Sequence, residues 1–295
     1  MLLFTHMISL RETLAQAQSR KQALGHFNFS DSTGLRAIFE AAHNLNLPVL
    51  VGLSEGERGF VGDQRAVDMV RGLREEYDYP IFLNADHTHS LEKIKAAVQA
   101  GFDAVLFDGG KLSWEENLRQ TKEVVDYVKS VNPNILVEGE IGYIGSGSQI
   151  LKEVPEGAAL DSKDLTTPEQ AKEFVQFTGV DLLAPAVGNI HGIIVAEGFV
   201  ERLDQERVKA IQEASRVPLV IHGASGLQKE DLEGAVRSGV GIVHINTELR
   251  VAWTAGIKKN ITANPEETTP YKLLGGALDE MRAVAEEKLK VFARL

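Results

Sequence analysis

The sequence predicts an α/β protein with the (β/α)8, or TIM-barrel, architecture, and three observations lead to this prediction. The chain has 295 residues, a length typical of such barrels. Roughly eight short apolar runs alternate with longer segments of helical periodicity. The runs are apolar throughout, as parallel strands buried on both faces are. A doubly wound sheet is the competing architecture, but no GxGxxG motif follows the first run.

The predicted strands are spread along the whole chain. Each is a short, mainly apolar run of the length that buried strands have. Because each run is followed by a segment with helical periodicity, the pattern repeats as strand and helix in turn. Strands are expected at residues 23–29, 48–54, 80–86, 104–109, 135–142, 182–188, 218–225 and 241–246.

Amphipathic segments lie between the predicted strands, and their ends carry helix signals. In residues 90–101, Ser90 is placed as an N-cap and Gly101 as a C-cap. Residues 167–179 begin with Thr-Pro and close on a glycine in the same way. Helices are predicted at residues 32–46, 90–101, 167–179 and 228–239, and an amphipathic helix suited to packing on the barrel or on another subunit is predicted from about residue 270.

No low-complexity tract or Pro/Gly-rich linker divides the chain, so we expect residues 1–295 to form a single domain with a C-terminal helical extension from about residue 270. The longest irregular stretch runs roughly over residues 146–165, after the fifth predicted strand. A long insertion at the C-terminal side of a barrel strand is where a lid or substrate loop is expected.

Composition and charge exclude several classes of function. The balance of 31 basic against 42 acidic residues gives a net charge of -11, which argues against nonspecific nucleic-acid binding. The absence of cysteine excludes disulfides and thiolate metal sites. The apolar residues 1–10 are too short to span a membrane and lack a basic n-region and a cleavage site, so a cytoplasmic protein without a membrane partner is expected.

Ionisable and polar residues fall at or near the ends of most predicted strands. The active site of a (β/α)8 barrel is built at the C-terminal ends of its strands, so these side chains are expected to face one pocket. The arrangement carries more information than any single residue, since a lone strand-end aspartate or histidine is commonly a structural group. The residues are Asp86, His87, Asp108, Glu138, Glu140, His191, His222, His244 and Asn246.

Three of the chain's 8 histidines, His87, His191 and His222, lie at the same end of different predicted strands. In a cysteine-free protein, a metal must be held by histidine and carboxylate. Three converging imidazoles form a common catalytic Zn²⁺ shell with one position left for substrate, although Co²⁺ and Mn²⁺ also suit such ligands. The sequence favours this interpretation over three unrelated structural histidines.

Glycine-rich segments adjoin two of the proposed ligands. Gly192 follows His191, and Gly223 to Gly226 follow His222. Exposed backbone N–H groups in such loops bind phosphate, and barrels place phosphate sites after their seventh and eighth strands, where Ser225 and Thr247 lie. A simple tight turn is the alternative interpretation of these residues.

The chain resembles the class II, metal-dependent ketose-bisphosphate aldolases, which include the fructose- and tagatose-bisphosphate enzymes. The resemblance covers nearly the whole chain and is carried by the segments NADHTHS, AVLFDGG, VEGEIG, TGVDLLAPAVGNIHG, PLVIHGASG and VHINTELR. It implies reversible aldol cleavage of a ketose bisphosphate in carbohydrate metabolism, as in glycolysis, to dihydroxyacetone phosphate and an aldehyde phosphate. It also implies a homodimer or homotetramer.

The resemblance implies a role for each matching residue. Asp86 matches the catalytic acid/base, and the Zn²⁺ ligands would be His87, His191 and His222. Asp108 and Glu140 match positions that hold a second cation or an alternate site for the zinc. The shell of the dihydroxyacetone phosphate half would be Gly192, Gly223, Ala224, Ser225 and Thr247, and Ser54 matches a contact to the phosphate of the aldehyde half. His244 stands where the family has a substrate-binding asparagine, with Asn246 two residues on, and we expect both to contact substrate.

Departures from the family pattern leave the substrate open. Many relatives carry an acidic residue in the loop after the fifth strand, whereas here no carboxylate follows until Glu153. Fructose 1,6-bisphosphate is the first expectation, and tagatose or sedoheptulose bisphosphate is the alternative. A metal-dependent hydrolase on the same barrel and a non-catalytic protein that binds metal and sugar phosphate are the further alternatives.

Overall fold

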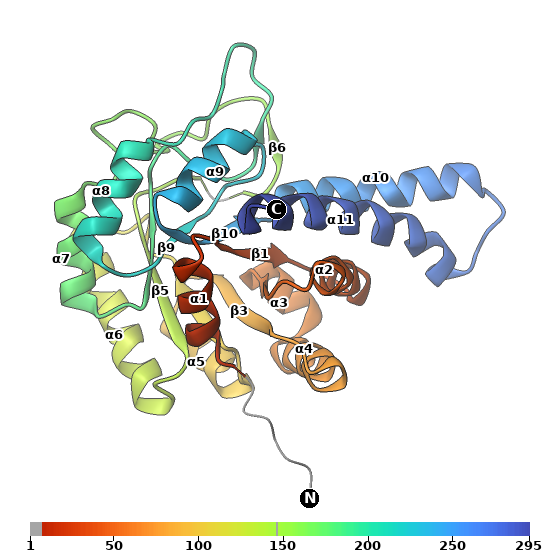
Figure 1. Cartoon of the computed structure of the whole chain (residues 1–295), viewed down its shortest axis with the longest axis horizontal. Helices are drawn as coiled ribbons and strands as arrows, with labels where there is room; N and C mark the ends of the chain where they lie inside the picture. The colour runs from red at the N-terminus through yellow and green to blue at the C-terminus, as the bar shows by residue number, and fades with distance from the viewer. Residues whose placement is uncertain (1–7, 146) are drawn as a thin grey trace, which may run out of the picture.

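The computed structural model describes residues 8–145 and 147–295, and it confirms the predicted barrel. Eight parallel strands close on themselves in the order β1-β10-β9-β7-β5-β4-β3-β2, with helices around them (Figure 1). The barrel strands are β1 Leu24–Asn28, β2 Val49–Leu53, β3 Ile81–Thr88, β4 Ala104–Phe107, β5 Leu136–Ile141, β7 Leu182–Pro185, β9 Leu219–Ile221 and β10 Val240–Ile245.

Several strands end earlier than the sequence predicts, and the reason is local. The predicted strand 182–188 ends at Pro185, and the predicted strand 218–225 ends at Ile221. In both cases the lost residues run into glycines with positive φ, Gly188 at 103° and Gly223 at 63°, which turn the chain out of the barrel. His222 therefore follows its strand instead of lying within it.

The irregular stretch predicted at 146–165 contains a short strand, and Ser146 lies outside the described residues. β6 (Ile150–Leu151) pairs in parallel with β8 (Ile193–Ile194), which follows His191. The loop after β5 is thus tied to the loop after β7 by a small sheet outside the barrel.

Eleven helices are described, and the predicted ones begin and end close to the expected residues. Ser90 accepts a hydrogen bond from the N–H of Lys93, and Gly101 closes that helix at φ 105°, as a left-handed C-cap does. The helices are α1 Leu10–Ser19, α2 Ser32–Leu45, α3 Glu55–Val61, α4 Asp63–Tyr77, α5 Leu91–Ala100, α6 Trp114–Val131, α7 Pro168–Thr178, α8 Gln205–Ser215, α9 Lys229–Arg237, α10 Thr247–Ala263 and α11 Pro270–Ala293.

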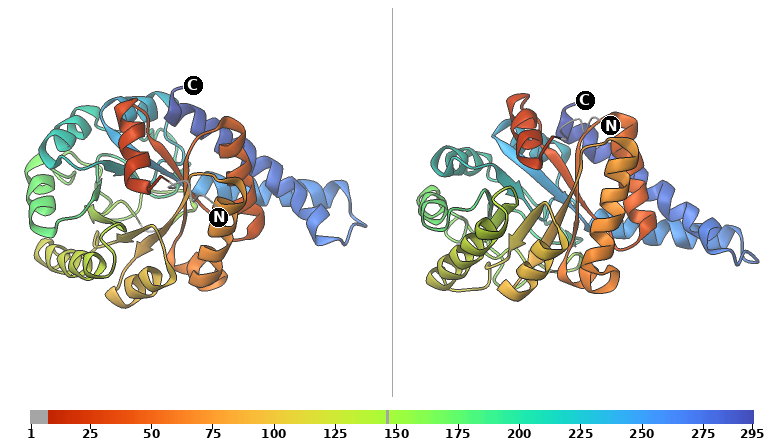
Figure 2. Two further views of the ribbon diagram at one scale, coloured as in Figure 1. Left: turned by 60° about the horizontal axis from the view of Figure 1, so that its bottom comes forward. Right: turned by 90° about the horizontal axis from the view of Figure 1, so that it is seen from below.

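The last two helices form a hairpin that extends beyond the ring of helices around the barrel (Figures 1 and 2). Gly256 of α10 and Gly276 of α11 lie against each other, and a Cβ on either would stand 2.2–2.3 Å from the other's carbonyl oxygen. Glycine is therefore required where these helices cross. The C-terminal end of α11 returns to the barrel, where Phe292 is fully buried and lies 6.5 Å from the ring of Phe27 in β1.

Apolar side chains close the N-terminal half of the barrel, and this leaves the other end for chemistry. Each barrel strand contributes a residue near its N-terminal end to a buried cluster, to which β7 adds Ala184, and Leu10, Leu14 and Ala17 of α1 pack against it. Polar side chains in the barrel are consequently confined to the C-terminal ends of the strands, as in other (β/α)8 barrels. The strand residues are Leu24, Leu50, Phe82, Ala104, Leu136, Leu182, Val220 and Ile242.

Among the described residues, no helix combines the length and the apolar character that crossing a membrane would take.

Candidate active site

A pocket of about 310 Å³ opens at the C-terminal end of the barrel. Of the residues predicted to face the pocket or to bind metal or substrate, all but Glu138, Glu140 and Ala224 line it. Glu138 and Glu140 are buried, and Glu140 lies within reach of His87 and Asp108. Ala224 lies on the predicted phosphate loop, but it is fully buried in the hydrophobic core.

An irregularity in β3 brings two adjacent side chains to this pocket. Consecutive side chains of a regular strand point to opposite faces. In β3 the register with β4 shifts between Ala85 and Thr88, and His87 has a positive φ of 38°. Asp86 and His87 both line the pocket as a result. Such a backbone conformation is unfavourable for a residue with a side chain and is found mainly where function requires it.

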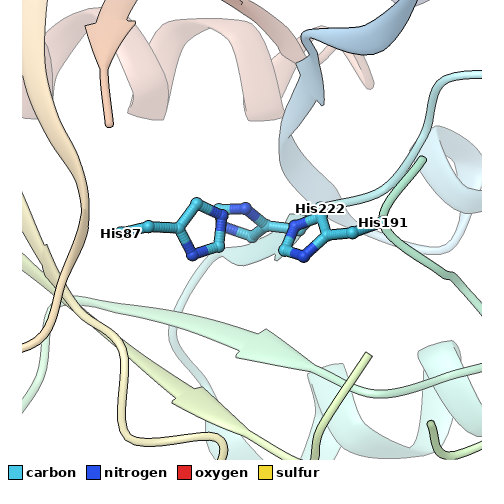
Figure 3. A group of neighbouring side chains, drawn as sticks. All are labelled: His87, His191 and His222. Atoms are coloured by element: carbon cyan, nitrogen blue, oxygen red, sulfur yellow. The ribbon is translucent and has the colours of Figure 1, made fainter. Parts of the chain in front are cut away.

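Three imidazole rings, one from the end of β3 and two from the loops after β7 and β9, converge on one point. The ring centroids of His87 lie 4.6 Å from His191 and 4.8 Å from His222, and those of His191 and His222 lie 5.8 Å apart. One ligand atom from each ring lies within 4.8 Å of the others. Figure 3 shows the rings directed toward one another. The structure thus brings together the three histidines that the sequence singles out.

Each ring has one nitrogen bonded to the protein, which determines the nitrogen left for a cation. Nδ1 of His87 pairs with Asp108 at 2.8 Å, and Nδ1 of His191 donates to the carbonyl oxygen of Gly145 at 2.8 Å. These bonds leave Nε2 free on both rings. Hydrogen bonds of this kind orient metal-binding histidines and fix their tautomers, so the donor set fits a divalent cation.

His222 differs, because its Nε2 donates to the carboxylate of Glu138 at 2.7 Å. Its Nδ1 is therefore the nitrogen available to a cation. Glu138 is one of the buried acidic residues of β5, and the sequence placed it among the strand-end residues without a role.

The charges of the site compensate one another when no cation is bound. Burial lowers the pKa of His87, but the carboxylates of Asp86, Asp108 and Glu140 outweigh it and raise this pKa to about 10. Burial and the neighbouring imidazoles lower the pKa of His191 to about 3. His191 is thus neutral, as a metal ligand must be, whereas a cation that binds His87 must displace a proton.

A second group of potential ligands lies beside the first. His87, Asp108 and Glu140 each place a ligand atom within 4.8 Å of the others. Burial and the charge of Asp108 raise the pKa of Glu140 well above its usual value. A cation bound here would offset the repulsion between the two carboxyl groups.

Asp86 is held in place by amide and imidazole neighbours. Asn28, at the end of β1, donates to its Oδ2 at 2.9 Å, and Oδ1 lies 3.5 Å from Nδ1 of His244. Although burial opposes ionisation, His87 and His244 keep the pKa of Asp86 well below its usual value. The buried aspartate is therefore ionised and able to accept a proton.

A stacked pair of imidazoles lies behind Asp86. The rings of His26 and His244 are 3.5 Å apart and almost parallel, at 5°. Gly52 makes room for His26, because a Cβ there would stand 2.2 Å from its Nε2. Ligand lone pairs lie in the ring planes, so two parallel rings cannot direct theirs to one cation. His26, which sequence reasoning left without a role, belongs to the wall of the site.

The glycine-rich loops come close enough to the pocket for their backbone N–H groups to bind a ligand there. Gly192 and Gly223 have φ values of 105° and 63°. A Cβ at Gly223 would stand 2.3 Å from the carbonyl oxygen of Ile190, so no other residue fits. Asn246 makes no side-chain capping bond to α10, and the helix begins at Thr247 beside the pocket. Such a helix start attracts anions.

The pocket also carries one arginine, in the first turn of α10. Arg250 is the only lysine or arginine of residues 8–145 and 147–295 that lines the pocket. It donates to the buried carboxylate of Glu57 at 2.6 Å. The same carboxylate accepts hydrogen bonds from Ser54 and, at 2.9 Å, from Asn28. Sequence reasoning missed Asn28, Glu57 and Arg250, although Asn28 could have been found because it ends the first strand.

This arrangement limits the class of protein to barrel enzymes that use a divalent cation on a small, polar substrate. A family model described as fructose-bisphosphate aldolase class-II matches residues 8–294. The fructose-bisphosphate aldolase of Geobacillus stearothermophilus is 33% identical over 292 residues, which cover 97% of this chain and 96% of the relative.

Solved structures agree with this match. The YdjI aldolase from Escherichia coli K12 superposes with a TM-score of 0.80 at 29% identity, and 97% of both chains is covered. A putative fructose-1,6-bisphosphate aldolase from Coccidioides immitis superposes with a TM-score of 0.77 at 30% identity, over 96% of this chain and 95% of that one.

The chain belongs to the class II fructose-bisphosphate aldolase family. It is a carbon–carbon lyase that catalyses aldol cleavage of a ketose bisphosphate. The hydrolase and the non-catalytic protein considered as alternatives are thereby set aside. The family is generally metal-dependent, in agreement with the donor sets at the barrel mouth.

Proposed function

We propose that this aldolase uses Zn²⁺ held by His87, His191 and His222 and cleaves fructose 1,6-bisphosphate reversibly. The convergence of three oriented imidazoles beside the ionised Asp86 is the observation that carries this proposal. Co²⁺ and Mn²⁺ are the other cations that suit the ligands. Asp108 and Glu140 are proposed to hold a second cation or an alternate position of the first.

The pocket offers a binding place for each half of the substrate. Backbone N–H groups of Gly192 and of Gly223 to Ser225, together with Asn246 and Thr247, would bind the phosphate of the dihydroxyacetone half. Ser54 and Arg250 also line the pocket, where both donate to Glu57, and would face the phosphate of the aldehyde half. The scissile bond would then lie near Asp86.

The chemistry requires a base and a means of stabilising negative charge. Asp86 would take the proton from the C4 hydroxyl as the bond between C3 and C4 breaks, and Asn28 would hold its carboxylate in position. When bound, a divalent cation supplies Lewis-acid stabilisation of the enediolate charge. No Schiff-base lysine is needed, and none lines the pocket among the residues described.

A second candidate is an aldolase for tagatose or sedoheptulose bisphosphate. Nε2 of His244 has no hydrogen-bond partner among the described residues, and Nδ1 has only the contact to Asp86 at 3.5 Å, although the side chain is buried and lines the pocket. Beside Asp86, these nitrogens would contact the substrate hydroxyls next to the scissile bond. The configuration accepted at C4 therefore depends on His244.

The decisive assay uses purified protein and fructose 1,6-bisphosphate, with and without a chelator, coupled to detection of triose phosphate. We expect cleavage that the chelator stops and that zinc restores, and we expect His191→Ala to abolish it. Turnover that resists the chelator would contradict the metal site. Cleavage of tagatose bisphosphate at a higher kcat/KM would move the assignment to the second candidate.

We further propose that residues 1–295 act as one aldolase domain in the cytoplasm and assemble as a homodimer or homotetramer. The projecting hairpin of α10 and α11 supports assembly, because it exposes the apolar side chains of Val251, Ile261 and Tyr271. Light scattering coupled to size-exclusion chromatography would test this, and a monomer at micromolar concentration would contradict it.

A further inference from the structure

Lys288 of α11 is a buried lysine whose ammonium group is directed toward the substrate end of the barrel. The residue is 8% exposed, and Nζ lies 2.9 Å from Oε2 of Glu248 in the first turn of α10. Lysine is almost never buried without a partner of opposite charge. The pair joins the C-terminal part of α11 to the first turn of α10, two helices that lie side by side (Figure 1).

Glu248 contacts this loop directly. Its Oε1 accepts the N–H of Gly226 at 2.8 Å, and its own N–H donates to Oγ of Ser225 at 3.3 Å. Ser225 is buried and lines the pocket. Glu248 therefore fixes the loop at Gly226, while its carboxylate brings a negative charge to a place proposed to receive a phosphate.

A carboxylate beside a phosphate site has an electrostatic cost. It repels the incoming dianion, and it offsets the attraction that the positive end of the α10 dipole would exert on that dianion. The ammonium group of Lys288 compensates this charge from the side away from the pocket. The loop then keeps its bond to Glu248 without presenting a net negative charge.

We propose that Lys288 is a positioning residue, which acts through Glu248 to hold the loop of Gly223 to Gly226 and to cancel the charge that would otherwise repel the phosphate of the dihydroxyacetone half. The inference rests on the proposed function, since it assigns a phosphate to this loop. Lys288 itself does not touch substrate.

Four variants of the full chain test the inference: Lys288→Met, Glu248→Gln, the double variant, and Lys290→Met as a control at an exposed position of the same helix. Lys288→Met should raise the KM for fructose 1,6-bisphosphate about tenfold, because an uncompensated carboxylate would face the phosphate. The value of kcat should change less than about threefold, because the reacting atoms are untouched. Inhibition by inorganic phosphate should weaken by the same factor as KM.

The double variant separates charge cancellation from packing. Glutamine can still accept the N–H of Gly226, so removing both charges should return KM and phosphate inhibition to within about threefold of the wild type. Glu248→Gln alone should bind inorganic phosphate as tightly as the wild type or more tightly. A double variant as weak as Lys288→Met, or weaker binding by Glu248→Gln, would overturn the proposal.

Binding of inorganic phosphate, measured by calorimetry, gives a result that does not depend on turnover. If the wild type binds phosphate but cleaves no ketose bisphosphate, the proposed function fails while the role of Lys288 is still measured. If the wild type is an active aldolase and Lys288→Met binds phosphate normally, the inference about Lys288 fails alone. Should Lys288→Met not fold, the double variant and Glu248→Gln decide.

Discussion

Glu138 accepts a hydrogen bond from Nε2 of His222 at 2.7 Å, and both side chains are at most 2% exposed. The bond directs Nδ1 of His222 toward the other two imidazoles. It also makes the ring a better ligand, because the carboxylate stabilises positive charge on the imidazole. The geometry of the candidate metal site thus depends on a residue that contributes no ligand atom.

Glu138→Gln should therefore weaken metal binding while the fold is kept. The amide is the same size but carries no charge, so we expect a loss of about 10- to 100-fold in affinity for zinc. Competition with a chromogenic chelator measures this, with Glu169→Gln on the surface of α7 as the control. Unchanged affinity would mean that Glu138 is only a structural partner of His222.

Asp86→Asn should lower kcat strongly and leave the metal content unchanged. The amide keeps an oxygen for the bond from Asn28 but cannot accept a proton, and general-base catalysis is worth about 10²- to 10⁴-fold. Steady-state kinetics and elemental analysis on the same preparation give both quantities. Loss of the metal would show that Asp86 had been assigned the wrong role.

The site residues that could be predicted from the sequence are those whose positions follow from the order of the strands. His87 lies at the end of a barrel strand and His191 and His222 follow theirs, and closing the barrel brings such ends together whatever the details of the loops. Neither the register shift in β3 nor the positive φ of His87 could be predicted, because both depend on the pairing with β4. These two features bring Asp86 and His87 to the same pocket.

Other residues were missed because their roles arise only through partners distant in the chain. Glu57 reads as a capping residue of α3, which it is, but its carboxylate also binds Asn28 and Arg250. His26 lies in an apolar strand and gains a role by stacking on His244. Contacts of this kind follow from the barrel's closure between β1 and β10, which no local pattern encodes.

Arg250→Met should lower the activity on substrates that carry a phosphate on the aldehyde half and leave the activity on substrates without that phosphate nearly unchanged. Arg250 is the only lysine or arginine lining the described part of the pocket, so its loss should raise the KM for fructose 1,6-bisphosphate about tenfold, as loss of one charge-assisted contact does. The kcat/KM for fructose 1-phosphate should stay within about threefold. Equal losses for both substrates would point to damage through Glu57, and Arg237→Met on α9 is the control.

Glu201 gives the protein a pH-dependent stability that can be measured without substrate. Its Oε1 accepts the N–H of Ile190, next to His191, at 2.6 Å, and the residue is 9% exposed. Burial, with a smaller contribution from Asp231, raises the pKa of Glu201 to about 8 from its ordinary value of 4.5. The folded protein therefore keeps a proton at neutral pH that the unfolded chain has released.

The sign of the effect follows from that proton. Between about pH 4.5 and pH 8 the folded state binds more protons at Glu201 than the unfolded state does, so the free energy of unfolding falls as pH rises, by at most roughly 1.4 kcal/mol per pH unit. Glu201→Gln stays neutral and keeps an oxygen for Ile190, so it should match the wild type at pH 5 and be more stable at pH 8.5. Urea unfolding at the two pH values, with a chelator present throughout to fix the metal state, measures the difference. If wild type and variant lose stability equally between pH 5 and pH 8.5, Glu201 is ionised in the folded protein and the assignment is wrong.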